Sequence, residues 1–185
     1  MSLPLGDASD AELVALAIGG GQAAFRALTE RHRDSVYRLA RGATGDVEEA
    51  FDVTQEAFIA AFGALTSYDT ARPFRAWIAR IALNKARDAM RRRAVRRLFS
   101  FTMPKTVTEP ADPSVAADDA LISRQELARA SAVIAQLPAK LKEVLLLRTA
   151  EGMSLAETAQ ALGISEKAAE MRLYRARKVL SAALD

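Results

Sequence analysis

The sequence contains no cysteine and a single histidine among its 185 residues. The absence of cysteine excludes disulfides and thiolate metal sites and fits a reducing compartment, so we expect a cytoplasmic protein. A lone histidine without paired carboxylates in an apolar setting leaves no acid–base or nucleophilic pair. We therefore expect neither an enzyme nor a small-molecule substrate, and no metal or other cofactor, because a metal site needs several donors.

Long apolar runs and strand patterns are also missing. No stretch approaches the length of a membrane span, and the first residues lack the basic and apolar segments of a signal peptide. The chain is therefore expected to be soluble and unprocessed, with no membrane insertion. No alternating apolar pattern indicates a strand, and the hydrophobic content of 50% is enough for a core in each of two small domains. The predicted fold class is all-α.

In the first half, apolar residues recur at helical spacing between glycine-containing breaks. The patterns predict a short helix over residues 10–18 capped by Asp10, a second helix over 22–41, and a third over 47–65. The glycines at 19–21 lack a preceding strand and a following lysine, so they indicate a helix break and not a phosphate loop. His32 lies on the apolar side of its helix and is interpreted as structural. The third helix is expected to bury a stripe consisting of Phe51, Thr54, Phe58, Ala61, Phe62 and Leu65.

The opposite face of the third helix carries a mixed strip. Asp52, Glu56, Ile59 and Gly63 share this face, and Gln55 lies at its edge. Such a strip is either an ordinary solvated surface or a docking surface for another protein.

A long cationic helix follows, which Pro73 can open at its first turn. Arg80, Asn84, Arg87 and Arg91 recur on one side at spacing suited to phosphates and base edges. Phe74 and Trp77 lie near the start of this row and are expected to be core residues.

From residue 100 to 119 the sequence has three prolines, little periodicity and a shift to acidic residues, which predicts a flexible linker. The acids at 109–119 either keep the tether solvated or mimic a nucleic-acid strand. The predicted division is an N-terminal helical domain over 1–98, a flexible acidic linker over 99–120 and a C-terminal helix-turn-helix domain over 121–185. Helical pattern returns near Leu121, and Pro138 can start a further helix.

Residues 154–180 carry the pattern of a helix-turn-helix. Ser154 and Glu157 have the spacing of a capping box, Gly163 stands where a left-handed turn is needed, and Ser165 can cap the second helix. Ala169 and Leu173 begin the apolar face of that second helix. The outward face is the candidate reader of base edges and consists of Lys167, Glu170, Met171, Tyr174, Arg175 and Lys178.

The residues resemble a family, the bacterial RNA polymerase sigma factors of the extracytoplasmic-function group. Residues 52–58 are similar to that group's polymerase-docking helix, 74–93 to its promoter-melting helix and 137–180 to its promoter-reading domain. The resemblance implies a stress-responsive sigma factor that binds core RNA polymerase and promoter DNA, opens the duplex and is held inactive by an anti-sigma factor. By match of position, Asp52, Gln55, Glu56 and Ile59 would contact the clamp helices of the polymerase's largest subunit.

The same resemblance assigns promoter contacts. In the element nearer the start site, the melted strand would be held by Ser67, Tyr68, Phe74, Arg80, Asn84, Arg87, Asp88, Arg91 and Arg92. The outward face from Lys167 to Lys178 would enter the major groove of the upstream element, with Arg172 and Arg177 flanking it toward the backbone. The family's linker runs near the path of nascent RNA, so the acids at 109–119 acquire a possible role as an RNA mimic.

One position departs from the group's pattern. Where the group commonly has a threonine-valine-lysine-like run, this chain has Ala168, Ala169 and Glu170. A carboxylate cannot grip a phosphate but can accept a hydrogen bond from a cytosine amino group, so Glu170 predicts an altered upstream element.

Two alternative functions compete with this interpretation. A conventional helix-turn-helix regulator would bind duplex DNA without polymerase, but it leaves the Asp52 to Gly63 strip and the arginine row unexplained. A sigma-like decoy would bind an anti-sigma protein and never touch DNA, so it could dispense with both basic rows.

Overall fold

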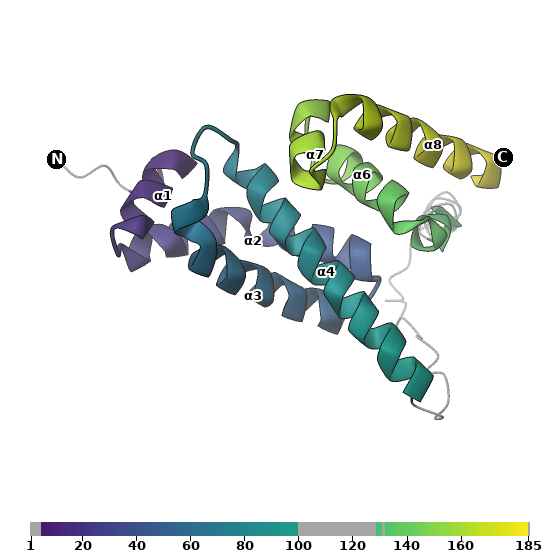
Figure 1. Ribbon diagram of the computed structural model, residues 1–185, viewed down its shortest axis with the longest axis horizontal. Coiled ribbons are helices and arrows are strands. Elements are labelled where there is room, and N and C mark those ends of the chain that lie inside the picture. Colours follow the sequence, from purple (N-terminus) through teal and green to yellow (C-terminus); the bar gives the residue numbers. More distant parts are fainter. Residues whose placement is uncertain (1–4, 100–128, 131, 185) are drawn as a thin grey trace, which may run out of the picture.

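The computed structural model describes residues 5–99, 129–130 and 132–184, and all regular structure in them is helical, as predicted. The helices fall into an N-terminal and a C-terminal group (Figure 1). The elements are α1 (Asp10–Ile18), α2 (Gln22–Thr44), α3 (Val47–Ala64), the 3-10 turn η1 (Leu65–Ser67), α4 (Phe74–Phe99), α6 (Ala139–Thr149), α7 (Leu155–Leu162) and α8 (Glu166–Leu184). The predicted linker lies outside the described residues except for its first position, so the two domain boundaries stay predictions.

The N-terminal domain is a bundle of α2, α3 and α4, with α1 lying across one end of it (Figure 1). Small side chains make its centre: Ala57 and Ala61 of α3 and Ala82 and Ala86 of α4 are fully buried. Because interaxial distance depends on side-chain size at the contact, these alanines let the helices approach closely.

Local capping residues set where the N-terminal helices begin and end. Ser9 forms a capping box with Glu12 and therefore takes the N-cap that the sequence assigned to Asp10. Helix α2 does not stop at Gly42 but continues to Thr44, where Gly45 ends it with a φ of 71°. Asp46 then caps α3 by accepting a hydrogen bond from the backbone N–H of Glu49.

The C-terminal domain forms the predicted helix-turn-helix. Ser154 and Glu157 make both bonds of a capping box at the start of α7, and Gly163 ends that helix with a φ of 64°. Ala169, Leu173 and Ala176 of α8 are buried against α6 and α7, as their spacing predicted. This packing fixes the opposite face of α8 outward.

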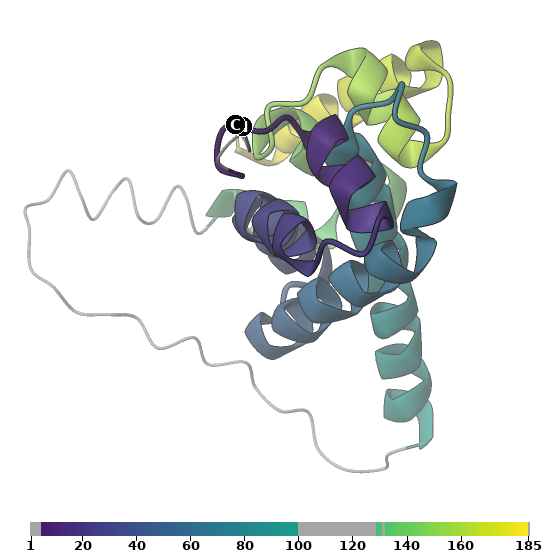
Figure 2. The same ribbon diagram turned by 90° about the vertical axis from the view of Figure 1, so that its left-hand side faces the viewer.

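The two domains pack against each other. Helix α7 lies against α4, and α6 lies against α2 (Figures 1 and 2). Leu146, Leu147, Met153 and Ala161 of the C-terminal domain are buried in the same apolar cluster as the N-terminal core. The second half of α4 extends beyond this contact, and its last residue, Phe99, is 83% exposed (Figure 1).

The prediction for the buried side of α3 was partly wrong. Phe51 and Phe62 are 58% and 54% exposed, whereas Thr54, Phe58 and Ala61 of the same stripe are buried. The alanine-rich contact with α2 and α4 is narrower than the apolar stripe in the sequence, so the two outer phenylalanines remain at the surface. No helix among the described residues is long and apolar enough to cross a membrane.

Candidate nucleic-acid and polymerase interfaces

The strip on α3 is an exposed surface. Asp52 and Gln55 are exposed, Glu56 is half-buried, and the side chain of Ile59 is 72% exposed. Together with Phe62, which is 54% exposed, Ile59 forms an exposed apolar patch, and covering such a patch favours binding of a partner.

An apolar groove between α2 and α3 continues this strip, and the sequence analysis missed it. Ile59, Phe58 and Phe62 of α3 line it together with Phe25 of α2. The rings of Phe25 and Phe62 meet edge to face with centroids 4.6 Å apart. Phe62 follows Ile59 by three residues, and this spacing could have indicated an extended apolar surface. The same spacing also fits a buried position, and the sequence analysis assigned Phe62 to the buried stripe.

Glu56 connects the docking strip to the cationic helix. Its carboxylate lies 3.3 Å from the guanidinium of Arg92 and 3.7 Å from the ammonium of Lys85. Arg93, one position further along α4, pairs with Glu49 at 3.0 Å. The strip on α3 and the basic surface of α4 are therefore neighbours joined by ion pairs.

The predicted basic row on α4 divides into two halves with different surroundings. In the distal half, Arg91 and Arg92 are exposed, and Arg91 pairs with Asp88 at 2.9 Å. In the proximal half, Arg87 donates from Nη1 to Asn84 at 2.7 Å and its other nitrogens face a carboxylate of α6.

Carboxylates of the C-terminal domain engage the proximal half. Arg87 donates from Nε and Nη2 to the two oxygens of Glu143, at 2.6 and 2.7 Å. Arg75 makes the same bidentate contact with Glu157: its Nε and Nη2 donate to the two carboxylate oxygens, at 2.6 and 2.5 Å. Both pairings raise the pKa of the arginine through the hydrogen bonds, and the bonds from Arg75 hold the pKa of Glu157 at about 2.

A third contact joins α2 to the loop after α6. Arg38 donates to both oxygens of Glu151 at 3.2 Å, and the hydroxyl of Ser35 bonds to the same carboxylate. The side chain of Glu151 is only 4% exposed.

Two of the residues expected to hold a melted strand lie in the core instead. Tyr68 and Phe74 are 8% and 2% exposed, and their rings pack edge to face with centroids 5.6 Å apart. Trp77 packs on both rings, and His32 packs on Phe74. The buried Phe74 takes the core position that the sequence predicted, and the burial of both rings argues against the strand contacts that the resemblance implied for Tyr68 and Phe74.

The remaining residue of that loop and the lone histidine have local roles. Ser67 is exposed, and its hydroxyl donates to the carbonyl of Ala64 at 2.7 Å. His32 lies 2.9 Å from Asp10, so it ties α2 to α1 as a structural residue. Partial burial opposes ionisation of Asp10, but bonds from His32 and Arg31 outweigh it and lower the pKa of that carboxyl.

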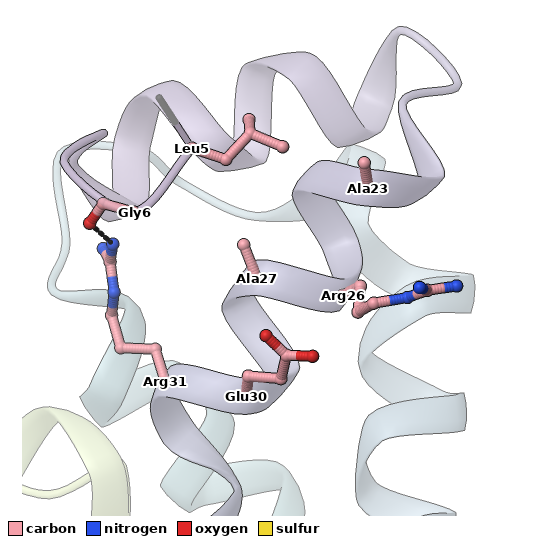
Figure 3. Close-up of a pocket in the computed structure, with 7 residues that line it drawn as sticks. All are labelled: Leu5, Gly6, Ala23, Arg26, Ala27, Glu30 and Arg31. Carbon is pink, nitrogen blue, oxygen red and sulfur yellow. Dashed lines mark hydrogen bonds between the residues drawn. The ribbon is translucent and has the colours of Figure 1, made fainter. Parts of the chain in front are cut away.

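The chain before α1 is held against α2. Figure 3 shows a hollow between this segment and α2, with Arg31 reaching over to the carbonyl of Gly6 at 3.1 Å. Arg31 also donates to the carbonyl of Ala8 and to Asp10. These hydrogen bonds hold the chain before α1 against α2, and the hollow lies between these two packed segments. In the part of the chain that the structure describes, no group of three or more potential ligands could hold a metal ion.

The outward face of α8 is open to solvent. Tyr174 is 63% exposed and Met171 is 41% exposed, while Arg175 and Lys178 are also exposed. Lys167 and Glu170 lie on this face and pair at 3.0 Å. Arg172 is half-buried, at the side of the face where the sequence placed it. The helix therefore presents charged, hydroxyl and apolar groups of the kinds that contact base edges and phosphates.

Comparisons with known proteins find one family region in each of the two domains. The model of sigma-70 region 2 matches residues 28–96, and the model of sigma-70 region 4 matches residues 127–180. The chain is 40% identical to the RNA polymerase sigma factor CnrH of Cupriavidus metallidurans, covering 96% of this chain and 95% of CnrH. It is 30% identical to the ECF RNA polymerase sigma factor SigW of Bacillus subtilis, over 87% of this chain and 89% of SigW.

A solved structure agrees with these matches. The structure of CnrH in complex with the cytosolic domain of CnrY is similar with a TM-score of 0.71 and 38% identity, covering 95% of this chain and 97% of that chain. Two sigma-70 regions in order, and relatives aligned over nearly the full length, agree with the exposed strip and the two basic helices. The chain belongs to the extracytoplasmic-function group of the sigma-70 family of RNA polymerase sigma factors.

Proposed function

We propose that this chain binds core RNA polymerase through α3, reads an upstream promoter element with α8 and holds a melted strand with α4. The observation that carries the proposal is the presence of three separate exposed surfaces of matching chemistry on one chain: an apolar and acidic strip and two basic helix faces. Its place of action is the cytoplasm, where core polymerase transcribes, and its control is by an anti-sigma factor, as is common in the family.

Each surface has its own residues. We assign polymerase binding to Asp52, Gln55, Glu56 and Ile59, extended by Phe62 and the groove beside it. The cations and amide of α4 would hold strand phosphates and base edges, with the exposed Arg80, Asn84, Arg91 and Arg92 and the half-buried Arg87 as the contacts. The upstream element would meet Lys167, Glu170, Met171, Tyr174, Arg175 and Lys178, with Arg172 toward the backbone.

The decisive experiment is run-off transcription with purified core polymerase on a promoter library. The wild-type chain should give promoter-specific transcripts that core polymerase does not give without it. Binding of duplex DNA without transcripts would instead support a conventional helix-turn-helix regulator. Binding to an anti-sigma protein without DNA binding would support a sigma-like decoy.

A variant pair tests the polymerase surface. Ile59→Asp places a charge at the centre of the strip and should weaken core binding at least about 30-fold, the effect of losing about 2 kcal/mol at an interface hot spot. Val179→Asp is the matched control, because Val179 is 44% exposed on α8, in the other domain. Equal core binding by the two variants would contradict the assignment of Ile59.

A further inference from the structure

Four side chains form a line along the exposed side of α8. Lys167, Met171, Tyr174 and Lys178 follow one another at spacings of four, three and four residues, and residues at these spacings share one face of a helix. All four are exposed. We call them the central line. It has a cation at each end and two largely apolar side chains in the middle.

The packing of α8 makes the central line the part of the helix farthest from the domain core. Ala169, Leu173 and Ala176 are buried against α6 and α7 on the opposite side of the helix. Met171 is 41% exposed and Tyr174 is 63% exposed. When α8 enters the major groove with its exposed side forward, these two side chains are therefore the ones brought to the base edges.

The charged side chains of this face lie around Met171 and Tyr174. Glu170 is on one flank of the central line, where it pairs with Lys167 at 3.0 Å, and Arg175 is on the other flank. Long basic side chains at the ends and edge of a recognition helix suit phosphates. The centre of the face is left to a thioether and an aromatic ring.

Only one base offers an apolar group in the major groove. Guanine, adenine and cytosine present hydrogen-bond donors and acceptors there, whereas thymine adds its C5 methyl group. A thioether or an aromatic ring placed over donors and acceptors removes their water without replacing the lost hydrogen bonds, which is unfavourable. The same groups placed against a methyl group bury apolar surface on both sides. The centre of the face is therefore complementary to thymine.

The spacing of the two residues matches neighbouring base pairs. Three residues of α-helix advance about 4.5 Å, and successive base pairs are about 3.4 Å apart along the DNA axis. A helix lying along the groove thus places Met171 over one base pair and Tyr174 over the next.

We propose that Met171 and Tyr174 recognise the methyl groups of thymines at two neighbouring base pairs of the upstream promoter element, in either strand. Lys167 and Lys178 hold phosphates at the two ends of this contact. The inference rests on the proposed function, which brings α8 to duplex DNA, and it adds the base that the centre of the helix selects.

Exchange of thymine for deoxyuridine tests the inference, because it removes the C5 methyl group and keeps the hydrogen-bonding pattern. The holoenzyme first selects duplexes from a library that is randomised in the upstream element. Deoxyuridine then replaces each thymine of the selected element in turn. Binding of the holoenzyme should weaken about fourfold at two neighbouring positions, the effect of one buried methyl group, and should be unchanged at the others.

Two variants connect each methyl group to its side chain. Met171→Ala should bind the thymine and deoxyuridine duplexes equally at one of the two positions, and Tyr174→Ala should do so at the other. Both residues are exposed and alanine favours helix, so α8 is preserved. Val179→Ala is the matched control, because Val179 is 44% exposed on the same helix but lies off the central line. It should keep the preference for thymine at both positions.

Three results would overturn the thymine contact. They are a selected element without thymines at neighbouring base pairs, deoxyuridine that binds as well as thymine at every position, and a preference for thymine that survives in both Met171→Ala and Tyr174→Ala.

Run-off transcription with subsaturating holoenzyme separates this inference from the proposed function. If no promoter of the library gives transcripts, the proposed function fails and the inference fails with it. If the selected promoter gives equal yields with thymine and with deoxyuridine in the upstream element, only the thymine contact is wrong.

Discussion

The two basic helices of this sigma factor differ in what surrounds their cations. Helix α8 packs its apolar face inward and leaves Arg175 and Lys178 in solvent. Helix α4 lies between its own bundle and the C-terminal domain, so Arg75 faces the partly buried carboxylate of Glu157 and Arg87 faces the buried carboxylate of Glu143. Cationic residues of the same type are therefore available on one helix and occupied on the other.

This difference suggests an order of events. A surface that is already open can meet duplex DNA directly, whereas one that is paired must first exchange protein carboxylates for phosphates. The exchange replaces one set of charged hydrogen bonds with another, so its net change in binding free energy is small. The main requirement is that the two domains separate. The surface that would hold melted DNA is thus the one restrained in the free chain.

The largest expected effect comes from reversing charge on the open helix. Arg175→Glu/Lys178→Glu should weaken duplex promoter binding by the holoenzyme about 100-fold at 0.1 M salt and reduce the magnitude of the salt slope by about 2. Binding of a fluorescent single-stranded oligothymidine by the free chain should change far less. A comparable loss for both ligands, measured by fluorescence anisotropy, would break the distinction between the two helices.

On α4, the distal and proximal arginines should behave differently. Arg91→Ala should lower oligothymidine affinity about five- to tenfold in both wild type and Glu143→Gln, because Arg91 is open in each. Arg87→Ala should cost affinity in Glu143→Gln but much less in wild type, where it also removes the pair with Glu143.

A double-mutant cycle on Arg87 and Glu143 makes this quantitative. Strict additivity of Arg87→Ala with Glu143→Gln would show that Arg87 and Glu143 are not coupled. The matching cycle with Arg91 should be additive.

Glu170→Lys should change which bases α8 prefers with a smaller change in overall affinity. The carboxylate can accept a hydrogen bond from a cytosine amino group, and lysine instead donates to guanine, so the preference should shift about five- to tenfold at one position. Selection of bound duplexes from a randomised upstream element measures this. An unchanged preference would remove Glu170 from the reading residues.

The smallest effect is a pH dependence of the pair between Arg75 and Glu157. Bonds from Arg75, with a smaller share from the capping bonds of Ser154, lower the pKa of Glu157 from the ordinary 4.5 to about 2, so the contribution of the Arg75 bonds to closure is complete above about pH 5. The contribution is lost as pH falls from 4.5 toward 2. Domain closure followed by fluorescence energy transfer should therefore weaken as pH falls below about 4.5, and more in wild type than in Glu157→Gln; parallel curves would contradict this role.

The sequence predicted those parts of the fold that depend on local signals. The capping box of Ser154 and Glu157, the turn at Gly163 and the apolar face of α8 depend on contacts within a few residues, and the structure confirms all three. The exposed strip on α3 also followed from helical spacing.

Long-range packing accounts for what the sequence did not reveal. The sequence analysis ended the second helix at residue 41, before Gly42. The glycine is instead needed for space, because Leu146, more than a hundred positions away, packs against it. Glu143 and Glu157 are ordinary helix residues in the sequence, and only the packing of α6 and α7 on the N-terminal domain brings them to Arg87 and Arg75. Tyr68 matched a strand-binding motif, but its burial depends on the positions of Phe74 and Trp77, whereas the buried position of Phe74 agrees with the core role that the sequence predicted for it.

The most direct test of the restrained surface is the distance between the domains before and after polymerase binding. Because the chain has no cysteine, Ala23→Cys and Ala183→Cys give two unique sites for a donor and an acceptor dye, one on α2 and one on α8. The energy transfer measured in the free chain should fall when core RNA polymerase is added. The same transfer in the free chain and in the holoenzyme would contradict the account.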